Sequence, residues 1–219
     1  MRQAIFTFLA LANLTLVYAA PVTDVTNGLL NNAQEPTWRI QVEDGKPLVI
    51  FNGSIQKIMA QLENDYPQYA AKAPKRIDDD VQAQELAQTT AAPQLEARAA
   101  VQKRDHNICY NFPVAEERHI RAGIAYLRGI RGDLRIRPGP RVCDRISCSN
   151  KAGIYLCNDN PFEKWIKSWD DVANGAQACN NECRYFSYGG SLTGWVTSGQ
   201  CFHDPGLFNV ILRYDDDKC

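Results

Sequence analysis

The stretch RVCDRISCSNKAGIYLCN, residues 141–158, decides how the C-terminal half of the chain folds. Residues 141–148 and 152–158 each predict a β-strand, because both are short runs rich in β-branched and apolar side chains. Ser149-Asn150-Lys151 between them indicates a turn. Two strands with so short a connection are expected to pair antiparallel.

Helices and further strands flank this hairpin. Residues 115–128 predict an amphipathic helix, with apolar side chains at helical spacing. Ser168 predicts the N-cap of a second helix that ends near Glu182. Residues 195–202 and 208–214 predict two more strands. The order α-β-β-α-β-β indicates an α+β fold, a small disulfide-stapled α/β sandwich with one antiparallel sheet and both helices on one face.

The cysteines all lie in this half of the chain. They are Cys109, Cys143, Cys148, Cys157, Cys179, Cys183, Cys201 and Cys219. An even number of cysteines in a secreted domain predicts four disulfides, although the sequence does not choose among the pairings. We expect Cys109 and Cys219 to close one wide loop. Cys179 and Cys183, an i, i+4 pair, have metal-like spacing, but disulfides are favoured over zinc outside the cell.

A processing site separates this domain from what precedes it. Lys103-Arg104 is a dibasic pair that resembles a kexin-type cleavage site, which predicts a mature cysteine-rich domain of residues 105–219 and a prosegment of residues 20–104. The N-terminal segment starts with the positively charged Met1-Arg2 and continues with an apolar run too short to span a bilayer. It ends at Ala19, after small side chains typical of a cleavage site. Residues 1–19 therefore predict a signal peptide and a secreted, extracellular protein.

The prosegment has two parts. Residues 38–64 predict a hairpin followed by a helix, which either folds against the mature domain as a chaperone or is transient and removed. Residues 67–104 predict a solvated linker, because they are rich in Ala, Gln, Asp and Pro and poor in aromatic residues. The linker contains a second dibasic pair, Lys75-Arg76. Asn52 begins a glycosylation sequon.

Arginines mark the candidate contact surface. The mature domain carries equal numbers of acidic and basic side chains, which argues against a nucleic-acid partner. Residues 131–140 predict a Gly/Pro loop from which side chains project. The candidate contact residues are Arg128, Arg131, Arg135, Arg137 and Arg141. Arg131-Gly132-Asp133 also has the form of an adhesion tripeptide, although such tripeptides recur by chance.

Catalytic signatures are weak. No esterase elbow, zinc-protease or phosphate-loop motif is present in the sequence, so we expect no enzyme activity, cofactor or metal site. The alternative is a small secreted ribonuclease or other hydrolase that uses His119 with Glu116 or Glu117. Residues 158–160 and 215–217 offer oxygen ligands for calcium, but a solvated turn and tail are favoured because neither has alternating ligands.

Residues 139–149, 152–160, 199–202 and 208–213, with the final Cys219, resemble blocks in small secreted cysteine-rich effectors of filamentous fungi. In outline they are also similar to the killer toxins of smut-fungus viruses. The resemblance implies a small α/β sandwich that acts without catalysis on a host plant, in virulence, cell death or immune modulation. The alternative is an antifungal toxin that affects ion transport. The expected partners are a host protein, cell-surface or membrane target and the processing protease, and we expect a monomer.

Overall fold

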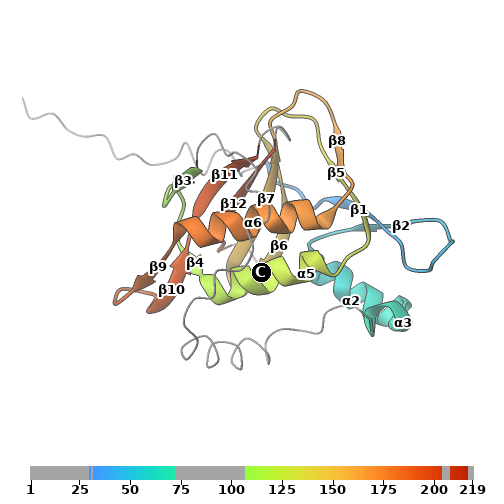
Figure 1. The fold of residues 1–219 in the computed structure, drawn as a ribbon, viewed down its shortest axis with the longest axis horizontal. Helices are drawn as coiled ribbons and strands as arrows, with labels where there is room; N and C mark the ends of the chain where they lie inside the picture. Colours follow the sequence, from blue (N-terminus) through green and yellow to red (C-terminus); the bar gives the residue numbers. More distant parts are fainter. Residues whose placement is uncertain (1–29, 31, 73–106, 204–207, 217–219) are drawn as a thin grey trace, which may run out of the picture.

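The computed structural model describes residues 30, 32–72, 107–203 and 208–216 of the chain. Its largest sheet has five antiparallel strands in the order β3-β11-β12-β7-β6 (Figure 1). The strands are β3 (Asn107–Cys109), β6 (Val142–Ser149), β7 (Ala152–Asn158), β11 (Gly199–His203) and β12 (Phe208–Tyr214). The predicted pair of residues 141–158 is therefore one side of this sheet.

Two helices cover one face of the sheet. α5 (Glu117–Arg128) and α6 (Trp169–Cys183) lie side by side in Figure 1 and pack on the long strands. The apolar stripe of α5 is buried, as its helical spacing predicts. The helix approaches the sheet closely because residue 123 is glycine: a Cβ there would lie 2.5 Å from Oγ of Ser147 on β6.

Two smaller antiparallel sheets extend the fold. One has the order β4-β10-β9, formed by β4 (Ala115–Glu116), β10 (Gly194–Thr197) and β9 (Arg184–Ser187). The other has the order β2-β1-β5-β8, formed by β2 (Val49–Asn52), β1 (Thr37–Ile40), β5 (Gly132–Ile136) and β8 (Lys164–Ile166). Its first two strands precede α2 (Ile55–Asp65) and α3 (Pro67–Ala70). We call residues 32–72 the N-terminal unit.

The core has two parts because side chains alternate across the sheet. All seven residues of β7 are buried. Ile154 and Leu156 belong to the cluster beneath the helices. Tyr155 and Cys157 belong to a second cluster, which also contains Leu30 from the N-terminal part of the chain. Residues before the predicted processing site therefore contribute to the core.

Disulfides connect the layers. They join Cys109 to Cys183, Cys143 to Cys157 and Cys179 to Cys201, which confirms that these six cysteines form disulfides. The expected Cys109–Cys219 loop is wrong, because β3 lies beside the end of α6, where Cys183 is the neighbour. Cys148 is also disulfide-bonded. Cys219 lies outside the described residues.

Some local expectations are corrected. Ser168 occupies the N-cap position of α6, but its side chain makes no capping hydrogen bond. The expected loop of residues 131–140 contains β5, because β1 supplies a strand with which it pairs. The single strand expected over residues 195–202 is two strands, β10 and β11, in different sheets.

Candidate functional site: an exposed aromatic hairpin

Five of the exposed aromatic side chains form a cluster at one end of the molecule. Most of them lie on the hairpin of β9 and β10, which projects from the helices and the main sheet in Figure 1. The exposed fractions are 89% for Tyr188, 54% for Tyr110, 45% for Trp195, 40% for Phe186 and 39% for Tyr185. We call these five residues, with Arg184, the aromatic hairpin.

The rings contact one another at steep angles. Phe186 packs edge-on against Trp195, with centroids 5.7 Å apart and planes at 89°. Tyr110 packs edge-on against Tyr185 at 5.2 Å and 88°. The guanidinium of Arg184 lies 5.1 Å from the centre of the Trp195 ring. Steep angles leave no row of coplanar rings on which a polysaccharide could stack.

Covalent and backbone contacts fix the base of the hairpin. Cys183 immediately precedes Arg184, and its disulfide to Cys109 places the neighbouring Tyr110 beside β9. Tyr110 has φ 63°, a conformation that is uncommon without glycine, and its N–H donates to the Ser198 carbonyl at 3.0 Å. β4 pairs with the inner side of β10. The cluster is therefore held in place before any partner binds.

The composition of the aromatic hairpin is typical of a protein-binding surface. Tyr, Trp and Arg are the residue types enriched among those that dominate binding energy. Residues 184–197 contain no acidic side chain and no lysine, types that are depleted in interface cores. Gly189, Gly190 and Gly194 give this stretch the composition of a loop, so the sequence alone named no site here. Aromatic runs on both sides of the glycines were the available signal for a hairpin.

The five predicted contact arginines are spread over several elements and make different contacts. Arg128, at the end of α5, donates to Oδ1 of Asn174 on α6 at 2.7 Å. Arg135 on β5 pairs with Glu163 at 2.6 Å, and this pairing lowers the pKa of the Glu163 carboxyl. Arg131 is 78% exposed. Arg141 is also exposed, with φ 63°.

The fifth arginine is structural. Arg137 donates to Oδ1 of Asp144 at 2.7 Å and to the carbonyl oxygens of Cys143 and Asn32, both at 3.0 Å. Burial raises the pKa of Asp144, and Arg137 opposes this by stabilising the charged carboxylate. Arg137 thus links β6 to the N-terminal unit.

The Arg131-Gly132-Asp133 tripeptide is not a projecting loop. Gly132 and Asp133 lie in β5, paired with β1. The Asp133 carboxylate accepts hydrogen bonds from two of the three guanidinium nitrogens of Arg39, with Nε at 2.6 Å. An adhesion receptor would have to break this pair, so the arrangement disfavours that function.

The predicted acid–base group is only partly assembled. Nε2 of His119 lies 3.7 Å from Oε2 of Glu116, which also pairs with Arg118 at 2.6 Å. Glu117 instead is buried against α6, where its Oε1 accepts a hydrogen bond from Asn180 at 2.8 Å. At 3.7 Å, Nε2 of His119 and Oε2 of Glu116 are beyond hydrogen-bond distance. A groove of 770 Å³ lies elsewhere, between the N-terminal unit and the segment that joins α5 to β5.

The two acidic segments serve the fold. The Asn158 side chain donates to the carbonyl oxygens of Arg137 and Phe162, and Asp159 accepts from Asn209 at 2.9 Å. Burial raises the pKa of Asp159, opposed by this hydrogen bond.

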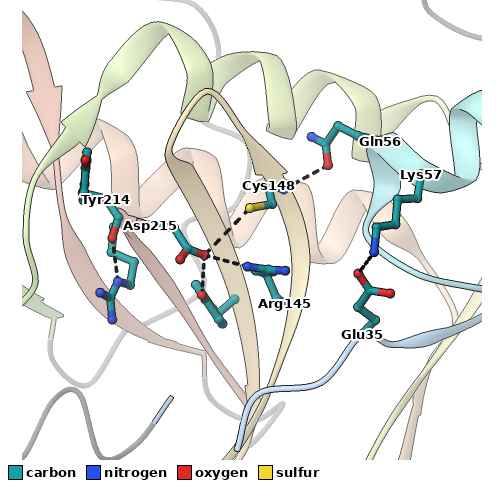
Figure 2. A network of polar contacts seen from close by, with 9 residues as sticks. Glu35, Gln56, Lys57, Arg145, Cys148, Tyr214 and Asp215 are labelled. Carbon is teal, nitrogen blue, oxygen red and sulfur yellow. Dashed lines mark hydrogen bonds and ion pairs between the residues drawn. The ribbon is translucent and has the colours of Figure 1, made fainter. Parts of the chain in front are cut away.

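Asp215 is buried where β6, β7 and β12 meet (Figure 2). It accepts a hydrogen bond from the Tyr155 hydroxyl and lies 3.3 Å from Arg145. Burial, together with the Asp215 carboxylate, raises the pKa of Tyr155. Asp216 is exposed and Asp217 lies outside the described residues.

Three cysteine sulfurs of the candidate metal cluster, those of Cys179, Cys183 and Cys201, lie within 4.8 Å of one another. All three belong to disulfides, which leave no thiolate to bind a metal. Their proximity reflects two neighbouring disulfides at the end of α6.

The processing residues Lys103 and Arg104 lie outside the described residues, and the boundary between prosegment and mature domain stays a prediction. Asn52 ends β2 and is exposed, with its Oδ1 accepting from the Thr37 hydroxyl at 2.8 Å. Its amide nitrogen, to which a glycan is attached, is not used by that bond.

None of the helices in the described ranges is long and apolar enough to span a bilayer. Comparison of the chain with protein-family models, with curated proteins and with solved structures found no match.

Proposed function

We propose that the chain is a secreted, effector- or toxin-like protein that acts by binding a protein at the surface of a target cell. The aromatic hairpin is the binding surface. The observation that carries the proposal is the gathering of five exposed aromatic rings and Arg184 on a hairpin whose base is fixed by the Cys109–Cys183 disulfide. A fixed surface loses little conformational entropy on binding.

The disulfides support the extracellular part of this proposal, since such bonds persist in oxidising compartments. The resemblance to fungal secreted cysteine-rich proteins supplies the class of target, a host plant cell. Killer toxins of smut-fungus viruses supply the alternative, a competing fungus. Maturation would be cleavage after Arg104 by a kexin-type protease. The action is binding rather than catalysis, because the exposed rings offer contact area and no reacting group.

A membrane is the rival target for exposed aromatic side chains, since Trp and Tyr also favour lipid headgroups. A protein is favoured because the single arginine at this surface is already engaged. Arg184 lies over Trp195 and also pairs with the buried Glu117 at 3.5 Å. Membrane-surface segments use several free cations to attract anionic lipid.

The test compares two aromatic-to-alanine variants. Tyr188→Ala removes the most exposed ring of the aromatic hairpin. Phe162→Ala removes another exposed ring, 77% accessible, that precedes β8 outside the aromatic hairpin. Fluorescently labelled protein is titrated onto plant protoplasts, onto fungal protoplasts and onto phosphatidylcholine–phosphatidylserine vesicles. We expect Tyr188→Ala to weaken binding to one protoplast type by about thirtyfold or more, the size typical of a dominant contact.

Phe162→Ala should change that binding by less than about threefold, and both variants should unfold at the wild-type temperature. Treating the protoplasts with protease should abolish binding if the target is a protein. Equal binding by Tyr188→Ala and wild type would reject the aromatic hairpin as the site. Strong binding to vesicles, or to protease-treated protoplasts, would replace the protein target by a membrane.

A further inference from the structure

The N-terminal unit is built into the same fold as the cysteine-rich domain. β1 is an inner strand of its sheet: one side pairs with β2 and the other with β5 (Figure 1). The β1–β5 register runs from Thr37 opposite Arg135 to Ile40 opposite Gly132. Without the N-terminal unit, β5 would keep only β8 as a neighbour and would expose an unpaired edge.

Apolar contacts continue across this boundary. Trp38 and Ile40 of β1 are fully buried, as are the inward-facing residues of α2. The Trp38 ring stacks on the Trp169 ring of α6, with centroids 4.1 Å apart and planes at 13°. Leu127 of α5 and Leu134 of β5, both from the cysteine-rich domain, belong to the same buried cluster. Removing the N-terminal unit would expose these side chains to water.

Polar contacts fix the register between the two parts. Gln56 of α2 donates from Nε2 to Oγ of Ser147 at 2.8 Å. Its Oε1 accepts from the N–H of Cys148 at 2.9 Å (Figure 2). The Arg39 guanidinium binds Asp133 through two nitrogens and lies 3.7 Å from the centre of the Trp165 ring. These are the contacts of a permanent interface.

The backbone of β5 is also shaped to accept β1. Gly132 has φ +142°, and a Cβ at this position would lie 1.9 Å from the Arg39 carbonyl oxygen. Only glycine allows the two strands to approach so closely.

No covalent bond other than the chain itself holds the N-terminal unit. The first cysteine of the sequence is Cys109, so no disulfide can reach back to it. Both dibasic pairs, Lys75-Arg76 and Lys103-Arg104, lie in the segment that connects β1–α3 to β3. A cut at either pair lies outside the strands of all three sheets.

We propose that processing does not release the N-terminal unit, and that the mature protein is a noncovalent two-chain molecule. The N-terminal chain carries β1, β2, α2 and α3, and the C-terminal chain carries the disulfides. The proposal rests on the cleavage proposed above. At each cut, water is added across one peptide bond, which leaves a carboxylate on the arginine and an amino group on the next residue. The N-terminal unit, which the sequence assigned to a prosegment that is removed, would then be a structural subunit of the mature protein.

The test uses the full chain, secreted from a host with a kexin-type protease and purified without reductant. Native mass spectrometry should show one species with the summed mass of both chains. Denaturing electrophoresis, also without reductant, should separate a cysteine-free chain from the disulfide-bonded chain. A native species with the mass of residues 105–219 alone would overturn the proposal.

A full-length single chain in both measurements would instead reject the cleavage. Purified kexin-type protease is then applied to the folded protein, and retention or loss of the N-terminal chain on size-exclusion chromatography still decides the two-chain proposal. Failure of cleavage and failure of retention are therefore distinguished. In a second check, the Lys103-Arg104 site is replaced by the recognition site of a different protease. If that protease also fails to cut the folded protein, the connecting segment is inaccessible and the two-chain proposal is overturned.

Two matched variants locate the interface. Ile40→Ala and Ile50→Ala make the same change in the same hairpin, but Ile40 is fully buried and Ile50 is 63% exposed. We expect Ile40→Ala to weaken retention of the N-terminal chain by about thirtyfold or more, and Ile50→Ala by less than about threefold. Equal retention in the two variants would show that β1 does not hold the chains together.

Discussion

Replacing Gly132 by alanine tests how closely β1 must approach β5. The new Cβ would lie 1.9 Å from the Arg39 carbonyl oxygen, whereas unstrained contacts between such atoms are about 3.5 Å. β1 would have to move by more than an ångström. That movement would disturb the strand pairing and the Arg39–Asp133 pair.

The backbone angle adds a separate cost, which a second glycine isolates. Gly194 has φ +121°, close to the +142° of Gly132, but a Cβ on Gly194 would have no neighbour within 4 Å. Gly194→Ala therefore carries the cost of the angle alone, about 1–3 kcal/mol. Gly132→Ala carries a similar cost and also loses two or more interstrand hydrogen bonds, at about 1 kcal/mol each. We expect it to destabilise the uncut protein by about 3–5 kcal/mol.

Urea unfolding of the uncut chain measures both changes. The midpoint should fall for both variants, with a larger fall for Gly132→Ala and unchanged slopes. In the cut protein, Gly132→Ala should also release the N-terminal chain, whereas Gly194→Ala should not. Equal midpoints for the two variants would refute the reasoning, because the clash with Arg39 would then contribute nothing.

Three further predictions concern other parts of the molecule. Peptide mapping without reduction should find the three described disulfides and a fourth between Cys148 and Cys219, the remaining two cysteines; a free thiol at Cys148 would contradict this. Asp159→Asn should be at least as stable as wild type at pH 7. Burial raises the pKa of Asp159 in the folded state above its unfolded value, so the folded state holds this proton more tightly than the unfolded state does. The free energy of unfolding of the wild type therefore falls as the pH rises from the unfolded pKa through the folded pKa. The difference in unfolding free energy between Asp159→Asn and wild type, measured in urea, should therefore disappear by about pH 4, near the unfolded pKa. A difference that stays constant with pH would refute this prediction. His119→Ala should leave cell binding and biological activity undiminished; a loss of activity with binding intact would favour the hydrolase alternative.

The sequence predicted the elements whose signal is local. The alternation and turn within residues 141–158 predicted β6 and β7, and the helical spacing of residues 115–128 predicted α5 to within two residues of its start. Pairings between distant segments left no such signal. β5 looks like a loop in isolation because its partner β1 comes from another part of the chain. The cysteine pairing failed for the same reason, since Cys109 meets Cys183 only once β3 and α6 are packed.

The candidate site was missed for a different reason. Arginines Arg128 to Arg141 stand out in the sequence as unpaired charge, but charge tends to be neutralised locally when a chain folds. Arg137 is used in this way, on Asp144 and two carbonyl groups. The rings at Tyr185, Phe186 and Trp195 would ordinarily be assigned to a core, because burial is their usual fate. Their exposure depends on the hairpin projecting from the fold, a property that periodicity does not record.

The change of composition near residue 105 predicts a processing boundary, but the fold continues from the N-terminal unit into the cysteine-rich domain. Composition reports where a chain cannot bury a core, and the residues between the dibasic pairs have that character. It does not report whether the segments on either side bind each other. Trp38 stacked on Trp169 and Gln56 bound to the backbone of Cys148 show that they do. On the proposal above, cleavage in this segment would divide the covalent chain and leave the structural unit whole. The product expected from the sequence alone, residues 105–219, would lack part of its own core.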